Sequence, residues 1–120
     1  MDSSSERKGK EIINMKVLIV EDEILSRIGL RQLIDWESLG LELLEDAKDG
    51  EEALRTIDSE CPEIILLDLN IPKVDGMQIL KQMNNYHYEH RVIIISCNEE
   101  FDKVKDALKL GAYDYLRKLN

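Results

Sequence analysis

The amino-acid sequence predicts an α/β fold, in which a parallel sheet carries helices on both of its faces. Short apolar runs alternate along the chain with segments whose apolar residues recur at helical spacing. The runs at 17–20, 64–67 and 92–95 each contain four consecutive apolar residues, which is typical of strands buried on both faces. A chain of 120 residues is long enough for one domain with one core.

In the first half of the chain, the pattern predicts two strands and two helices. Residues 1–14 are polar, and we expect a disordered leader or an artificial extension there, so that the domain spans 15–120. A strand is predicted at 16–20 and a helix at 24–34, with Leu25 and Ile28 on its apolar face. After the break at 35–40, a short edge strand is expected at 41–45 and a helix at 51–59.

The second half begins with the strand 64–67, which leads directly to the carboxylate of Asp68. Pro72 cannot donate a backbone hydrogen bond, and the pair Asp75-Gly76 marks a turn, so the strand ends there. A helix is predicted after Gly76. A strand follows at 92–95, a helix at 101–111 and a last strand at 112–116.

The charge and cysteine content exclude several classes of function. The net charge is −9, and residues 1–14 contain equal numbers of acids and bases, so the whole excess lies in the domain. A domain with this much negative charge is a poor direct binder of nucleic acid or of an anionic membrane. Cys61 and Cys97 lack metal-site spacing and are typical of reduced thiols. With no apolar segment long enough to span a membrane and no signal peptide, we predict a cytoplasmic protein.

Charged and hydroxyl side chains follow the predicted strands. They are Glu21, Asp22, Asp68, Ser96 and Lys118. Right-handed crossovers place the carboxyl ends of parallel strands at one edge of the sheet, so these groups should meet there. Two carboxylates about 4 Å apart repel by about 4 kcal/mol at an effective dielectric constant near 20, and a bound Mg²⁺ would remove that repulsion. The pattern therefore predicts an aspartate that accepts a phosphoryl group in the presence of Mg²⁺.

From residue 15 to residue 118 the chain resembles the receiver domain of response regulators. The residues that carry this resemblance are Glu21, Asp22, Asp68, Pro72, Gly76, Ser96, Tyr115 and Lys118. The resemblance implies a flavodoxin-like, doubly wound sheet of five strands in the order 2-1-3-4-5. It also implies a signalling switch and not an enzyme: a sensor histidine kinase phosphorylates Asp68, and the signal passes to an output domain outside this chain.

The resemblance also implies a metal site and a phosphoryl site. Asp22, Asp68 and the backbone carbonyl of Asn70 would ligate Mg²⁺, and Glu21 would act through a water. Lys118 would bind an oxygen of the phosphoryl group.

Further residues are implied to respond to the phosphoryl group. Ser96 would move toward it, and Tyr115 would turn inward behind Ser96. Asn70 and Asn98 occupy positions at which family members tune the loss of the phosphoryl group to water.

The chain departs from the family pattern at its carboxyl end. Leu119 follows Lys118 where the family usually has proline, and the chain stops at Asn120 where the family continues into a fifth helix. We expect a truncated domain whose uncovered sheet face favours homo-oligomers. The segment 35–40 also resembles that of receivers joined to AraC-type DNA-binding domains, which implies a transcriptional regulator as the parent protein.

Three other functions remain open from the residues alone. A Mg²⁺-dependent phosphatase of the haloacid-dehalogenase type would need a second acid where Asn70 stands. A receiver-like interaction module that works without phosphorylation is favoured by the missing proline after Lys118. A flavin-binding domain of similar topology would need a loop rich in serine, threonine and glycine after the first strand, and Glu21-Asp22-Glu23 stands there instead.

Overall fold

Strands and helices alternate along the computed structural model, which describes residues 14–97 and 100–118. The elements are β1 (Met15–Val20), α1 (Ile24–Leu33), the 3-10 helix η1 (Glu37–Leu39), β2 (Leu41–Leu43), α2 (Gly50–Glu60), β3 (Ile64–Asp68), α3 (Gly76–Met83), β4 (Arg91–Ser96), α4 (Phe101–Lys109) and β5 (Asp114–Arg117). Asn98, Leu119 and residues 1–13 of the leader predicted at 1–14 lie outside the described residues.

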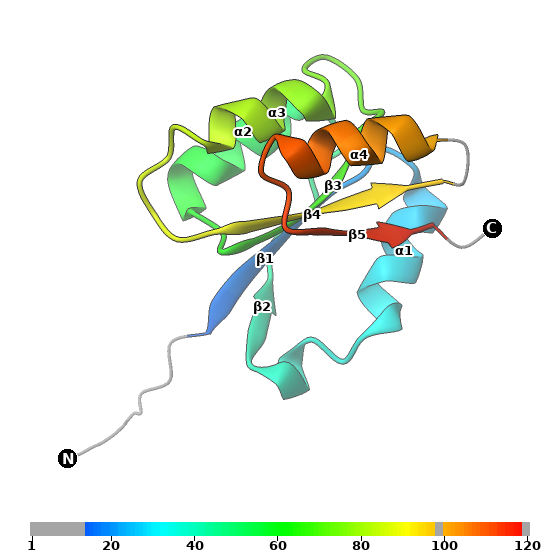
Figure 1. The fold of residues 1–120 in the computed structure, drawn as a ribbon. Helices are drawn as coiled ribbons and strands as arrows, with labels where there is room; N and C mark the ends of the chain where they lie inside the picture. Colours follow the sequence, from blue (N-terminus) through cyan, green and yellow to red (C-terminus); the bar gives the residue numbers. More distant parts are fainter. Residues whose placement is uncertain (1–13, 98–99, 119–120) are drawn as a thin grey trace.

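Within the described residues, the strands form one five-stranded parallel sheet in the order β2-β1-β3-β4-β5 (Figure 1). This confirms the predicted doubly wound, flavodoxin-like architecture. The strand order reverses between β1 and β3, and ligands of such sheets bind outside the carboxyl ends of the strands near that point. The register pairs Val20 with Leu67 and Asp68 with Ile95, so β1, β3 and β4 end close to one another.

One face of the sheet carries most of the hydrophobic core. Helices α2, α3 and α4 lie side by side over this face (Figure 1). They contribute fully or almost fully buried side chains, among them Ile57, Ile79 and Val104, which pack against Ile65 and Leu67 of β3. The helices on this side are therefore fixed by apolar burial, the dominant stabilising contribution in folding.

The other face has a smaller core and a poorly covered helix. Trp36 is buried against residues of β1, β3 and β4, and its indole Nε1 donates a hydrogen bond to the Leu30 carbonyl at 3.3 Å. None of the ten described residues of α1 is buried. Leu25 is 79% exposed and Leu33 is 57% exposed, so the apolar face predicted for this helix packs only in part.

Some boundaries differ from those predicted. Helix α1 ends one residue earlier than the predicted helix 24–34, and β2 is shorter than the predicted strand 41–45. The last strand is displaced from 112–116 to Asp114–Arg117. The reason is that the N–H of Ala112 still bonds the Ala107 carbonyl of α4 at 3.0 Å, so pairing with β4 begins only at Tyr113.

Candidate functional site

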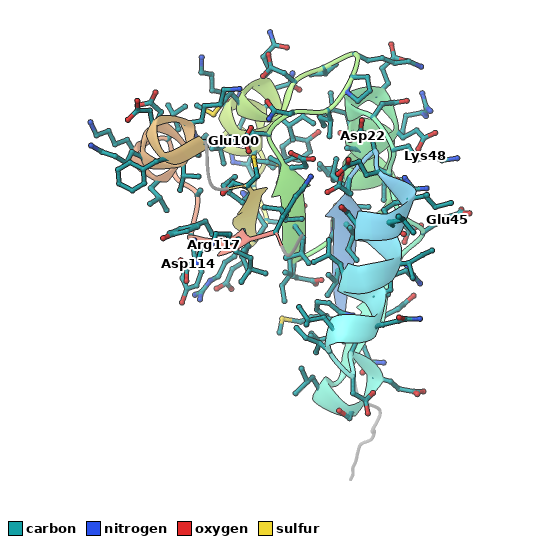
Figure 2. The ribbon with its side chains drawn as sticks, turned by 90° about the vertical axis from the view of Figure 1, so that its right-hand side faces the viewer. Asp22, Glu45, Lys48, Glu100, Asp114 and Arg117 are labelled. Atoms are coloured by element: carbon teal, nitrogen blue, oxygen red, sulfur yellow. The ribbon has the colours of Figure 1, made fainter. Side chains whose placement is uncertain are left out.

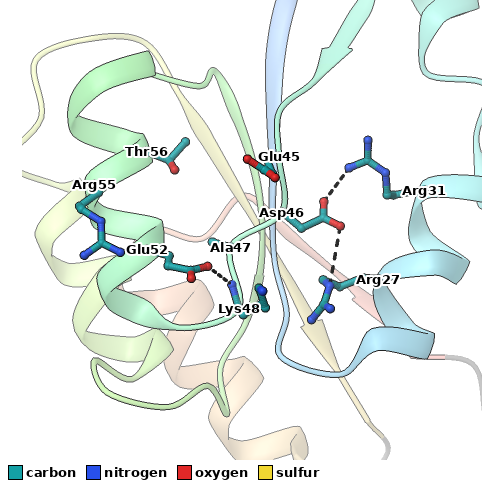
Figure 3. A pocket seen from close by; sticks show the side chains of 9 residues that line it. All are labelled: Arg27, Arg31, Glu45, Asp46, Ala47, Lys48, Glu52, Arg55 and Thr56. Atoms are coloured by element: carbon teal, nitrogen blue, oxygen red, sulfur yellow. Dashed lines mark hydrogen bonds and ion pairs between the residues drawn. The ribbon is translucent and has the colours of Figure 1, made fainter.

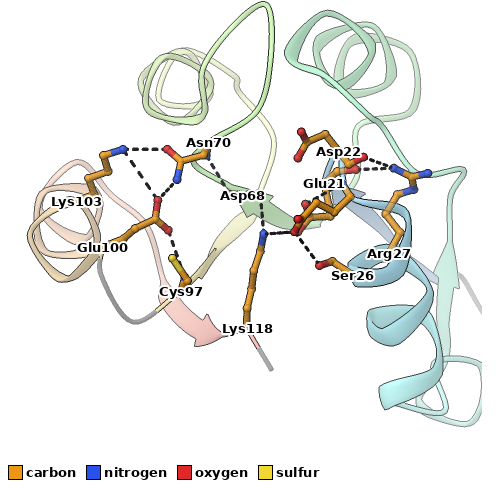
Figure 4. A network of polar contacts seen from close by, with 11 residues as sticks. Glu21, Asp22, Ser26, Arg27, Asp68, Asn70, Cys97, Glu100, Lys103 and Lys118 are labelled. Carbon is orange, nitrogen blue, oxygen red and sulfur yellow. Dashed lines mark hydrogen bonds and ion pairs between the residues drawn. The ribbon is translucent and has the colours of Figure 1, made fainter. Parts of the chain in front are cut away.

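The carboxyl edge of the sheet brings together side chains from the ends of three strands. Asp68 is the last residue of β3, Glu21 and Asp22 directly follow β1, and Lys118 directly follows β5 (Figure 4). The backbone N–H of Lys118 donates to the Ser96 carbonyl at 2.7 Å, which continues the β4–β5 pairing by one residue. Main-chain pairing, and not the lysine side chain alone, thus positions Lys118 at this edge.

Lys118 is the cation of the site. Its Nζ lies 3.0 Å from Asp68 Oδ2 and 2.9 Å from Glu21 Oε1. A third carboxylate, that of Glu23, contacts the same Nζ at 3.3 Å. Burial favours a lower pKa for Lys118, but its contacts with Glu21 and Asp68 outweigh burial and raise the pKa above the ordinary lysine value. Lys118 therefore stays protonated at physiological pH.

Asp68 is held by the loop that follows it. Its Oδ1 accepts a hydrogen bond from the backbone N–H of Asn70 at 2.9 Å. The loop then turns tightly, and Gly76 at the start of α3 donates its N–H to the Leu69 carbonyl at 3.1 Å. A Cβ at position 76 would lie 2.5 Å from Leu69 Cα and 2.8 Å from the Asp68 carbonyl oxygen, so only glycine fits against this backbone.

Glu21 is a fully buried carboxylate, with 0% of its surface exposed. Its Oε2 accepts from the backbone N–H of Glu23 at 3.1 Å. Its Oε1 accepts no well-directed hydrogen bond from the described residues, and the Lys118 ammonium is its charge partner. Burial raises the pKa of Glu21 to about 7, against the opposing effect of Lys118.

The acids of this edge lie close enough together to ligate a single cation. Glu21, Asp22 and Asp68 each offer a carboxylate oxygen within 4.8 Å of the others. Oxygen ligands of this kind suit Mg²⁺ or Ca²⁺. The under-bonded Oε1 of Glu21 and the excess of carboxylates over the single Lys118 ammonium fit a divalent cation at this point.

The site opens into a cavity of about 530 Å³, whose lining includes Asp22, Asp68, Asn70 and Lys118. The predicted switch residues lie elsewhere. Ser96 is 3% exposed and lines a neighbouring cavity of about 560 Å³ together with Tyr115, which is 46% exposed. The structure therefore brings Ser96 and Tyr115 together, beside the acidic cavity and not within it.

Four residues of the site were not identified from the sequence. They are Glu23, Arg27, Glu100 and Lys103. Arg27 donates to the backbone carbonyls of Glu21 and Asp22, at 3.1 and 3.0 Å, and so holds the loop after β1. Arg27 lies in the helix that directly follows the acidic run Glu21-Asp22-Glu23, and this nearness in sequence is the signal that could have indicated it. Glu100 and Lys103 have the i, i+3 spacing of a helical ion pair, but their contacts with Asn70 depend on how the start of α4 meets the loop after β3.

A separate polar cavity of about 540 Å³ lies between α1 and α2 (Figure 3). Asp46 pairs there with Arg31 at 2.7 Å and lies 3.9 Å from Arg27. Since Asp46 contacts both guanidinium groups, it helps to orient Arg27 toward the loop after β1. The contacts of Asp46 in this cavity thus help to position the loop after β1, although the cavity itself is separate from the site.

The fold and the site together define a doubly wound α/β domain with an acidic centre and one lysine at the switch point of its sheet. The family model that matches the chain is that of the response regulator receiver domain, over residues 17–120. The chain belongs to this family.

Several relatives of the chain are named transcriptional regulatory proteins. The chain is 34% identical over 103 residues to the uncharacterized transcriptional regulatory protein YesN of Bacillus subtilis, and 35% identical over 103 residues to the transcriptional regulatory protein HptR of Staphylococcus aureus. It is 39% identical over 107 residues to the alkaline phosphatase synthesis transcriptional regulatory protein PhoP of B. subtilis. These matches cover 86%, 86% and 88% of this chain, but only 28%, 40% and 43% of the relatives.

Solved structures agree with the family. The REC domain of AraT, a response regulator from Geobacillus stearothermophilus, superposes with a TM-score of 0.83 at 34% identity, covering 88% of this chain and 82% of that one. A response regulator receiver domain from Clostridium thermocellum gives a TM-score of 0.72 at 32% identity, covering 88% and 83%. Among the described residues, no helix is long and apolar enough to cross a bilayer.

Proposed function

We propose that this domain is the phosphoacceptor switch of a two-component system, and that Asp68 receives the phosphoryl group. One observation carries the proposal: the Asp68 carboxylate lies 3.0 Å from Lys118 Nζ, beside the acidic cluster at the carboxyl edge of the sheet. Membership of the receiver family supports the same assignment of Asp68 as the phosphoacceptor.

The chemistry assigned to the chain's own residues is simple. A carboxylate oxygen of Asp68 forms a bond to phosphorus, while the bond between phosphorus and the donor atom breaks and the donor leaves with its electron pair. Lys118 is placed to bind an oxygen of the transferred group, because its ammonium already contacts Asp68. The backbone N–H of Asn70 orients the attacking carboxylate through Oδ1.

The proposed cofactor is Mg²⁺. Asp22, Asp68 and the backbone carbonyl of Asn70 would hold it, and Glu21 would act through a water. Bound Mg²⁺ would neutralise the crowded negative charge and bind an oxygen of the phosphoryl group.

The proposed response involves Ser96 and Tyr115. Phosphorylation adds about −1.5 to −2 of charge and three acceptor oxygens at Asp68. The Ser96 hydroxyl would move to donate to one of these oxygens, and Tyr115 would turn into the neighbouring cavity that it already lines with Ser96. Asn70 and Asn98 would tune the loss of the phosphoryl group to water.

The proposed partners follow from the family and from the names of the relatives. A sensor histidine kinase would phosphorylate Asp68 in the cytoplasm. The signal would pass to a transcriptional output domain, since the matched relatives are named transcriptional regulatory proteins and this chain spans less than half of their length. The AraC type of that output domain stays a prediction. The domain itself would bind no DNA, being strongly acidic, and would act as a switch and not as an enzyme.

The proposal includes self-association. Leu25 of α1 and Leu116 of β5 line an apolar cavity of about 510 Å³ on the thinly covered face of the sheet. A second copy of the chain would cover this surface.

The decisive experiment is the intact mass of the protein before and after treatment with acetyl phosphate and Mg²⁺. The wild-type chain should gain the mass of one phosphoryl group. Asp68→Asn should gain none, because the amide is not a nucleophile. Equal modification of the two proteins would refute the assignment of Asp68.

A further inference from the structure

Three polar side chains join the loop after β3 to the start of α4 (Figure 4). The Asn70 Nδ2 amide donates to Glu100 Oε2. Lys103 Nζ donates to Asn70 Oδ1 at 2.9 Å and lies 4.0 Å from Glu100 Oε2. The backbone N–H of Cys97 donates to Glu100 Oε1 at 3.2 Å. Glu100 is therefore held by three groups. Asn70 lies in the loop after β3, Cys97 directly follows β4, and Lys103 lies in α4.

This position makes Glu100 part of the acidic cavity. Its side chain is only 10% exposed, whereas that of Lys103 is 56% exposed. Glu100 lines the same cavity as Asp22 and Asp68, and it comes from the α4 side while Asp22 comes from the α1 side (Figure 2). A phosphoryl donor that enters this cavity thus meets a carboxylate on each side.

We propose that the negative charge of Glu100 slows phosphoryl transfer to Asp68, and that Lys103 limits this effect by partly neutralising Glu100. The inference rests on the proposed function, because it assumes transfer to Asp68. Its physical basis is the repulsion between a carboxylate and an anionic donor in a partly solvated cavity. Glu100 is a positioning residue in this scheme: it acts on the donor's approach and on Asn70, and it makes no bond to the phosphoryl group.

The effect should depend on the charge of the donor. Acetyl phosphate is mainly a dianion at neutral pH, and phosphoramidate carries less negative charge. In both cases Asp68 attacks phosphorus; acetate leaves in the first, and ammonia leaves in the second after the nitrogen gains a proton. A charge effect should therefore be larger with acetyl phosphate, whereas a change of loop structure should alter both rates alike.

The experiment measures the rate of modification by intact mass, with each donor and with Mg²⁺ in excess. Glu100→Gln keeps the size of the side chain and one of its two accepting oxygens, and it should accelerate transfer from acetyl phosphate roughly fivefold. The gain with phosphoramidate should stay below about twofold. Lys103→Gln should slow transfer from acetyl phosphate, because Glu100 then loses its counter-charge. Asp106→Asn, the same charge change at an exposed position of α4, is the matched control and should match wild type.

Several outcomes would overturn the inference. The inference fails if Glu100→Gln leaves the rate of transfer unchanged or raises it equally with the two donors. It also fails if Lys103→Gln accelerates transfer as Glu100→Gln does, or if Asp106→Asn gives an equal gain in rate. If wild type is modified at Asp68 while any of these holds, the proposed function survives and only the role of Glu100 fails. If wild type is not modified at all, both proposals fail.

Discussion

Lys118 balances more negative charge than one ammonium group can neutralise. It contacts Glu21, Glu23 and Asp68, of which Glu21 and Asp68 are almost completely buried. Removing the cation from such a cluster leaves charged groups in a poorly solvated place, which is strongly unfavourable. The free energy of unfolding should therefore depend both on the Lys118 side chain and on a bound divalent cation.

We expect Lys118→Met to lower the free energy of unfolding by about 3 kcal/mol in metal-free buffer. Urea denaturation in the presence of a chelator measures this change. Added Mg²⁺ should restore part of the loss, because it replaces the missing positive charge. As a control, the same substitution in an Asp68→Asn background should have a smaller effect. A Lys118→Met protein as stable as wild type without metal would contradict this account.

At the scale of the elements, the approach of α3 to β3 depends on one glycine. A Cβ at Gly76 would overlap the backbone of Leu69, so one of the two elements would have to move. Gly76→Ala should reduce the free energy of unfolding by about 2–4 kcal/mol and slow phosphorylation of Asp68, because the displaced loop carries the Asn70 N–H.

Gly29 provides the matched control. It lies in the interior of α1, where an added Cβ would meet nothing within 4 Å. Gly29→Ala should therefore stabilise the protein by about 1 kcal/mol through helix propensity alone. Circular dichroism during chemical denaturation measures both variants, and equal effects of the same sign would argue against the steric explanation for Gly76.

A tyrosine joins α2 to the loop before β4. The Tyr86 hydroxyl donates to Asp58, and burial first, then this contact, raises the pKa of Tyr86 from 10.0 to about 12. Between pH 10.0 and about 12, the Tyr86 hydroxyl therefore keeps its proton in the folded protein but has lost it in the unfolded chain. The free energy of unfolding must fall as the pH rises through this range.

Tyr86→Phe should remove this part of the pH dependence. The measurement compares thermal unfolding of the two proteins at several alkaline pH values. The destabilisation caused by the substitution should be constant below pH 10 and shrink above it. A difference that stays constant over the whole range would exclude the proposed role of Tyr86.

The sequence predicted the elements better than the contacts between them. Apolar runs such as 64–67 predict buried strands because a strand with two covered faces must be apolar on both. The order of the strand ends then places Asp22, Asp68 and Lys118 at one edge. The apolar spacing of α1 predicted a helix with one apolar face, and Leu25 on that face is 79% exposed because the described residues leave it uncovered.

The contact of Glu100 with Asn70 could not be predicted in this way. It joins two loops thirty residues apart, and its existence depends on the backbone path of each. Periodicity and propensity describe neighbours along one element and carry no information on how two loops meet. Glu23 is different, because it extends the acidic run Glu21-Asp22 and could have been included on that ground.

For the molecule as a whole, the unequal covering of the two sheet faces predicts association. Leu25 and Leu116 are 79% and 39% exposed and line the same apolar cavity. Light scattering over a range of concentrations should show dimers. Added salt should favour them, because it screens the repulsion between two chains of net charge −9.

The double variant Leu25→Ser, Leu116→Ser tests which surface is responsible. It should raise the dimer dissociation constant at least about tenfold, since burying one leucine side chain contributes about 1.5–3 kcal/mol. The control is Leu108→Ser, which removes a 39% exposed leucine of α4 that does not line this cavity. A monomer at all concentrations would refute the proposed self-association.

The unequal covering also sets how freely each helix can vary. In a saturation mutagenesis library selected for folded protein, positions along α1 should accept polar residues, since none of its described residues is buried. Positions such as Ile79 and Leu80 of α3, which are 0% and 1% exposed, should reject them. Substitutions along α1 should therefore alter the surface of this chain while its architecture stays unchanged.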